Sequence, residues 1–115
     1  MIAPLSAIVL SCITFGAVDG DTLRGCGERV RIWGIQAPER NTPAGPAATR
    51  AMATLISGKR VDCYPAPNGQ VRDRYRRLVA LCKANGKDIA AEMVKQGRAR
   101  DYFRYSGGYY SGDRP

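Results

Sequence analysis

The chain has 115 residues and a mass of 12.5 kDa, which suits one domain and excludes a two-domain enzyme with a cleft between its lobes. Its 18 Lys and Arg against 10 Asp and Glu give a net charge of +8, and 14 of the basic residues are Arg. This excess favours a polyanionic partner, nucleic acid before anionic membrane, because guanidinium groups bind phosphate through paired hydrogen bonds. Histidine is absent, which excludes Ser-His-Asp and Cys-His catalysis, so carboxylates must carry any acid–base chemistry.

The N-terminal residues are uncharged and mostly apolar. Residues 1–10 are interpreted as the remnant of a secretory signal peptide, so the protein is expected to be secreted or periplasmic. Pro4 and Gly16 interrupt the apolar stretch, and no stable membrane association is expected. Residues 9–12 also resemble a lipoprotein cleavage box, but acylation of Cys12 would leave an odd number of thiols.

Five short segments alternate between apolar and polar residues, as strands do. They cover residues 12–18, 22–24, 29–35, 61–64 and 78–82. Asp19-Gly20 predicts a hairpin between the first two. In the third segment, Trp33 is expected on the same face as Arg29 and Arg31, opposite the apolar side chains.

Two helices are predicted, one between the third and fourth strands and one after the fifth. Ala48, Met52 and Ile56 fall on one helical face before Gly58, which offers a C-cap. Asp88 offers the N-cap of the second helix. Five strands with helices at these places are typical of a small Greek-key barrel, which closes its own sheet edges.

Four cysteines, Cys12, Cys26, Cys63 and Cys82, show no CxxC spacing and have no His nearby to complete a zinc site. Sequential strands usually lie side by side, which would place Cys12 near Cys26 and Cys63 near Cys82. Two disulfides with these partners are therefore predicted, and they imply an oxidising compartment. Four buried free thiols are the alternative.

Three short motifs stand in order along the chain: residues 18–22 (VDGDT), 31–39 (RIWGIQAPE) and 73–77 (DRYRR). Together they resemble the motifs of the staphylococcal-nuclease-like (thermonuclease) family, over about residues 12–110. The resemblance implies a mainly β fold, a five-stranded OB-fold barrel with two helices; the family's third, C-terminal helix is expected to be missing from this chain. The expected organisation is an N-terminal segment (1–10), the barrel domain (11–105) and a short flexible tail (106–115).

The resemblance also implies a monomeric, metal-dependent nuclease that hydrolyses phosphodiester bonds of DNA or RNA, with Ca²⁺ or another divalent cation as cofactor. The implied site residues are catalytic Arg31, Glu39 and Arg77, metal-binding Asp21, Gln36 and Ala37, and nucleic-acid-binding Arg74, Tyr75 and Tyr105, with Phe103 as an alternative to Tyr105. These residue types suit the chemistry, because a cation and two guanidinium groups stabilise the charge that a diester accumulates during attack.

Three positions depart from the family pattern. Gln36 replaces the second metal carboxylate and Ala37 a threonine, so weaker calcium binding or a changed metal preference is expected. Arg76 replaces a glycine in the arginine-rich loop, and non-glycine residues enter positive φ reluctantly. Two alternatives remain open: a domain of this family that binds nucleic acid without cleaving it, and a secreted partner-binding domain.

Overall fold

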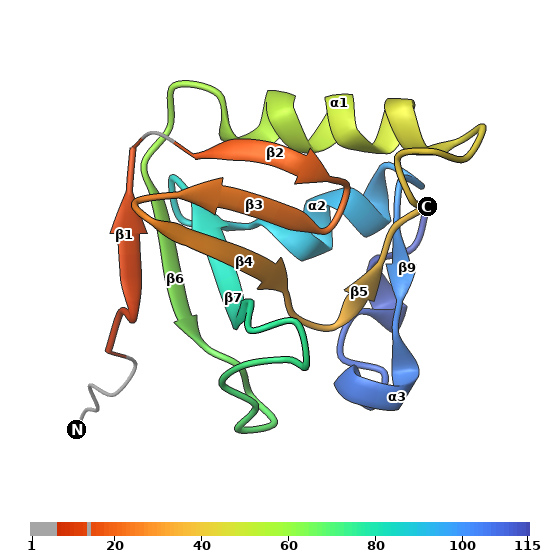
Figure 1. Ribbon diagram of the computed structural model, residues 1–115. Helices are drawn as coiled ribbons and strands as arrows, with labels where there is room; N and C mark the ends of the chain where they lie inside the picture. Colours follow the sequence, from red (N-terminus) through yellow and green to blue (C-terminus); the bar gives the residue numbers. More distant parts are fainter. Residues whose placement is uncertain (1–6, 14) are drawn as a thin grey trace.

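A computed structural model describes residues 7–13 and 15–115 of the chain (Figure 1). Its strands are β1 (Leu10–Cys12), β2 (Gly16–Asp19), β3 (Thr22–Gly25), β4 (Glu28–Ile32), β5 (Ile35–Gln36), β6 (Val61–Pro65), β7 (Leu78–Ala84), β8 (Lys87–Asp88) and β9 (Arg100–Asp101). The main sheet runs β1-β6-β7-β4-β3-β2, with β8 on β7, and β5 pairs separately with β9. The two ends of the main order, β1 and β2, follow one another along the chain, so the sheet curls into an OB-like barrel. The mainly β fold predicted from the sequence is confirmed.

The helices are α1 (Gly45–Ile56), α2 (Ile89–Lys95), α3 (Phe103–Ser106) and the 3₁₀ helix η1 (Ser111–Asp113). α1 lies along β2 (Figure 1) and buries one face made of Gly45, Ala48, Met52 and Ile56. Asp88 caps α2 as predicted, because its carboxylate accepts from the Ala90 N–H at 2.9 Å. Within the described ranges, none of these helices is long and apolar enough to span a membrane.

The predicted first strand, residues 12–18, is divided in the structure. β1 pairs with β6, whereas β2 pairs with β3. A segment that joins the two edges of a curled sheet must leave one neighbour before it meets the other, and this change of partner interrupts the strand. The predicted signal-peptide remnant begins with residues 1–6, which lie outside the described residues.

Both predicted disulfides form, Cys12–Cys26 and Cys63–Cys82, and no cysteine is free. Cys63 and Cys82 lie directly opposite each other in the β6–β7 ladder. The other disulfide joins β1 to the turn between β3 and β4. Disulfides of this kind are typical of proteins that fold in an oxidising compartment.

Trp33 was expected in a strand over residues 29–35, on the face of Arg29 and Arg31, but β4 ends at Ile32 and Trp33 lies in the turn that follows. The side chain is 3% exposed and packs edge-on against Tyr109 and Tyr110. Gly34 has φ +85°, so the chain turns after β4 and the alternation of faces ends there. A Cβ on Gly34 would also lie 2.8 Å from the Tyr110 ring, so only glycine admits this packing.

The segment 106–115, expected as a flexible tail, supplies a core residue. Tyr110 is 1% exposed, and its hydroxyl donates to Asp88 Oδ2 at 2.8 Å. α3 and η1 bring the chain to this position, although the sequence predicted no helix here. The packing of Tyr110 therefore ties the end of the described chain to the N-terminus of α2.

Candidate active site

The turn between β2 and β3 fixes Asp21 in the barrel. Gly20 permits this turn to pack closely, because a Cβ there would lie 2.7 Å from the Cβ of Ala37 and 2.9 Å from that of Ala48. Asp21 is 9% exposed and accepts from the Ala37 N–H at 2.9 Å through Oδ2. Its carboxylate is thus held at the point where the hairpin, β5 and α1 meet.

Arg31 from β4 reaches the same carboxylate. Its Nη2 lies 3.6 Å from Asp21 Oδ2, and its Nη1 donates to the Ile32 carbonyl at 2.7 Å. The Thr22 hydroxyl donates to the other oxygen, Asp21 Oδ1, at 3.2 Å. This network places one guanidinium group beside a buried carboxylate with its remaining N–H groups available to an anion.

Asp73 organises the arginine-rich loop between β6 and β7. Its carboxylate accepts from Arg77 Nε at 2.7 Å, from the Arg77 N–H at 3.0 Å and from the Tyr75 N–H at 2.9 Å. Burial raises the pKa of Asp73, but these hydrogen bonds and the Arg77 charge outweigh it and hold the pKa below its usual range. Arg76 adopts the left-handed conformation, φ 66°, so the turn is kept although Arg replaces glycine.

Arg77 also joins the loop to the Asp21 network. Its Nη1 donates to Thr22 Oγ1 at 3.1 Å, and Thr22 in turn donates to Asp21. Arg31 and Arg77 therefore flank one buried carboxylate. Although 46 positions separate them in the sequence, the parallel pairing of β4 with β7 brings their segments together.

A second ion pair fixes the loop against β4. Arg72 binds Glu28 through both guanidinium nitrogens, at 2.8 and 3.1 Å, and donates to the Arg76 carbonyl at 3.0 Å. The hydrogen bond from Arg72 holds the pKa of Glu28 below its usual range. The sequence did not reveal this pair, because its partners are 44 positions apart and each looks like an ordinary surface charge.

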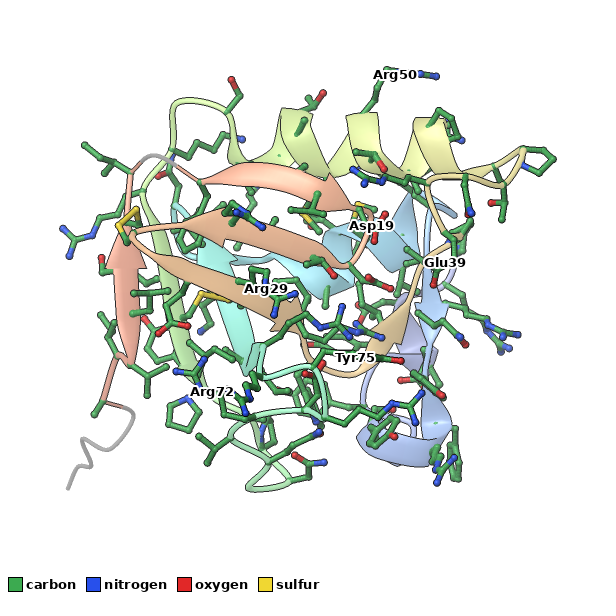
Figure 2. All side chains as sticks on the ribbon, viewed as in Figure 1. Asp19, Arg29, Glu39, Arg50, Arg72 and Tyr75 are labelled. Carbon is green, nitrogen blue, oxygen red and sulfur yellow. A yellow bond between two sulfur atoms is a disulfide. The ribbon has the colours of Figure 1, made fainter. Side chains whose placement is uncertain are left out.

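Arg31, Arg77, Arg74, Tyr75 and Tyr105 line one cleft of about 470 Å³. Tyr75 is 54% exposed, and the Cζ atoms of Arg74 and Arg77 lie 5.0 and 5.3 Å from its ring centroid. Arg29 donates to the Tyr75 carbonyl at 2.7 Å, and Figure 2 shows both residues on one side of the barrel. The cleft thus combines fixed arginines with an open aromatic face.

Glu39 is exposed, and its backbone is fixed. Its carbonyl accepts from the Thr42 N–H at 3.0 Å and from the Thr42 hydroxyl at 2.6 Å. α1 begins against it: a Cβ on Gly45 would overlap the Glu39 carbonyl oxygen, so this approach requires glycine. Figure 2 shows Glu39 and Asp19 at the same end of the barrel.

The side chain of Gln36 bonds to a residue of β9. Its Oε1 accepts from Arg100 Nη2 at 2.9 Å, because the β5–β9 pairing sets these two residues opposite each other. Of the expected metal-binding residues, Ala37 contacts Asp21 through its N–H, and Gln36 is directed to Arg100 instead.

Asp19 supplies a further carboxylate, at a position where the sequence predicted only a hairpin turn. Its Oδ1 is buried without a hydrogen-bond partner, two residues from Asp21. Two aspartates on either side of a glycine, one with an unpartnered oxygen, fit a hard divalent cation, which prefers oxygen ligands. Across residues 7–13 and 15–115, no group of three or more His, Cys, Asp or Glu side chains is placed to hold a metal. The site therefore offers few carboxylates.

Residues 29–112 match the family of staphylococcal nuclease homologues. The chain belongs to this family. It is 34% identical over 101 residues to an uncharacterized endonuclease of Haemophilus influenzae. This aligned region covers 84% of this chain and 54% of that protein. It is 31% identical over 106 residues to the succinoglycan biosynthesis protein ExoI of Rhizobium meliloti, covering 82% and 53%. It is 34% identical over 77 residues to a probable staphylococcal-like nuclease of Oryza sativa, covering 67% and 22%.

This staphylococcal nuclease homologue spans about half the length of the first two of these relatives. The matched region contains the arginines, Glu39, Tyr75 and Tyr105, but it begins after Asp19 and Asp21. Asp21 is therefore connected to the matched region by the structure, through its contacts with Arg31 and Ala37, and Asp19 stands two positions before it.

Proposed function

We propose that this staphylococcal nuclease homologue is a metal-dependent nuclease that hydrolyses phosphodiester bonds of DNA or RNA. The observation that carries the proposal is the network in which Arg31 and Arg77 flank the buried Asp21, directly and through Thr22. Relatives named endonuclease or nuclease support it. The net charge of +8 supports a nucleic-acid substrate.

Arg31 and Arg77 bind the phosphate. Each is held by an acidic partner, Asp21 for Arg31 and Asp73 for Arg77, so the guanidinium groups are oriented before the substrate arrives. Donors fixed in this way stabilise the negative charge that grows on the non-bridging oxygens during attack.

Asp19 and Asp21 hold the divalent cation, for which the family resemblance suggests calcium. When bound, this cation supplies positive charge to the phosphate oxygens. Gln36 bonds to Arg100 and brings no charge of its own, so weaker affinity is expected than for a site with another carboxylate.

Glu39 accepts the proton of the attacking water. The chain has no histidine, and Glu39 stands two residues after Ala37, which contacts Asp21. The Thr42 hydrogen bonds and the close approach of Gly45 fix its backbone, as a residue that orients water requires.

Tyr75, with Arg74 above its ring, stacks on a base next to the bound phosphate. Stacking accepts every base, so little sequence preference is expected. The two disulfides support secretion or a periplasmic location, and a monomer is proposed.

The test is degradation of labelled single-stranded DNA and RNA by the oxidised protein, with calcium, magnesium, manganese or chelator. Cleavage that requires a divalent cation and is lost in Asp21→Asn supports the proposal. Substrate that binds but stays intact under every condition would instead favour the alternative, a domain that binds nucleic acid without cleaving it. The hydrogen bond between Gln36 and Arg100 is the observation that supports this alternative.

A further inference from the structure

A second cleft, of about 450 Å³, opens beside Glu39. It is lined by residues 36–39 and 97–100. The cleft that contains Tyr75 is bordered by neighbouring residues of the same two segments: residues 31–34 from one, and Tyr102, Arg104 and Tyr105 from the other. Between the two clefts stands the β5–β9 pair, with Ile35 opposite Asp101. A nucleic-acid strand that crosses this pair of β-strands would pass from one cleft to the other.

The second cleft has the composition of a nucleotide site. Ala37, Pro38 and Ala99 provide apolar surface for a sugar or a base, and Arg98 and Arg100 provide positive charge. Both arginines are exposed, and neither takes part in an ion pair in the part of the chain that the structure describes. Their charge is therefore available to an anion from outside the protein.

Because Gln36 is uncharged, its hydrogen bond leaves the positive charge of Arg100 without an acidic partner among the described residues. The amide oxygen accepts from Arg100 Nη2 at 2.9 Å and orients the guanidinium without neutralising it. A carboxylate at position 36 would form an ion pair with Arg100 and compete with phosphate. Glutamine at position 36 thus weakens the expected cation site and leaves Arg100 free to bind phosphate.

We infer that Arg98 and Arg100 form a second phosphate-binding cleft, which holds the nucleic-acid strand on the opposite side of the scissile bond from Tyr75. The inference rests on the proposed function, because it takes the reacting phosphate to be held by Arg31 and Arg77 in the Tyr75 cleft, while Glu39 lines the second cleft. It also implies a substrate class: strands that extend in both directions from the cleaved bond, so that cleavage is internal.

The test measures binding of a labelled single-stranded DNA long enough to cross both clefts, in chelator, over a series of salt concentrations. In Arg98→Ala/Arg100→Ala, the negative slope of log affinity against log salt should become shallower by about 1.4, or about 0.7 for each lost phosphate contact. The loss of affinity should be greater for this strand than for a short oligonucleotide. Arg50→Ala is the matched control, because Arg50 is exposed on α1 and points away from both clefts (Figure 2).

Gln36→Glu provides a second variant that keeps the side-chain length. It should weaken binding of the long strand more in the wild-type background than when Arg100 is already Ala, because only the first background offers an ion pair that competes with phosphate. Wild-type protein that binds while Arg98→Ala/Arg100→Ala keeps the affinity and slope of Arg50→Ala would overturn this inference alone. Wild-type protein that neither binds nor cleaves any strand would overturn the proposed function and this inference with it.

Discussion

Arg77 donates from Nη1 to the Thr22 hydroxyl at 3.1 Å, across 55 positions of sequence. The same guanidinium donates from Nε to Asp73 Oδ2 at 2.7 Å. One side chain therefore connects the arginine-rich loop to the hairpin that carries Asp21. Both contacts depend on the planar, multidentate shape of the group, which orders the loop and suits the phosphate-binding role proposed for Arg77.

Arg77→Lys should lower the turnover of single-stranded DNA by about 10²–10³-fold, the usual effect of losing one oriented donor to a developing charge. A lysine ammonium is a point charge and cannot reproduce the fixed geometry toward Asp73 and Thr22 at once. The measurement is kcat under saturating substrate, with Arg76→Lys as the control, because the Arg76 side chain is exposed. Equal turnover in the two variants would contradict the assigned role.

Arg76→Gly should leave the protein as stable as the wild type or stabilise it by up to about 1.6 kcal/mol. Arg76 has φ 66°, and an L-residue in this conformation carries a strain of about 1–2 kcal/mol. Glycine relieves the strain but adds entropy to the unfolded chain, which offsets about 0.4–1 kcal/mol. Urea unfolding measures the difference, and a clear destabilisation would show that the Arg76 side chain makes a compensating contact.

Lowering the pH should reduce the stability that Asp73 contributes to the arginine-rich loop. Its pKa is lowered in the folded state, so its contribution to the free energy of unfolding is fully present above the unfolded pKa, about 3.9, and is lost as the pH falls through the folded pKa. Asp73→Asn removes this contribution. Urea unfolding of both proteins should be measured between about pH 3 and 6, a range around the ordinary Asp pKa. The wild type should be more stable than Asp73→Asn at about pH 6, and this difference should narrow toward about pH 3. A difference that widens toward the acid end would contradict a lowered pKa of Asp73.

The sequence allowed the elements with strong local signals to be predicted. Asp88 was identified as a helix cap and Asp19-Gly20 as a hairpin turn, because these signals act over a few neighbouring residues. The position of Trp33 was not predictable in the same way, since the positive φ of Gly34 ends the alternation on which the prediction relied.

The candidate site could be predicted only in part, because its contacts are distant in sequence. Arg77 was assigned by the resemblance, and the structure adds its link to Asp21 through Thr22. The direction of Gln36 depends on Arg100, 64 positions away, which reaches it through a two-residue strand pairing too short to leave a periodic pattern. Single-sequence patterns do not contain such a contact.

Tyr110→Phe should destabilise the protein by about 1–3 kcal/mol, the cost of leaving a partly buried carboxylate without its donor. Burial raises the pKa of the Tyr110 hydroxyl, so it remains a neutral donor to Asp88 at ordinary pH. Thermal or urea unfolding gives the change. Tyr109→Phe is the matched control, because Tyr109 is 56% exposed, and equal effects in the two variants would argue against the buried hydrogen bond.

Glu39→Gln tests the central claim most directly. The variant keeps the size of the side chain and the backbone contacts with Thr42, but it cannot accept the proton of water. Turnover of single-stranded DNA with calcium, and affinity for the same strand in chelator, should be measured on wild type and variant together. We expect kcat to fall by about 10²–10⁴-fold while the affinity is kept. Normal turnover by Glu39→Gln would contradict the account.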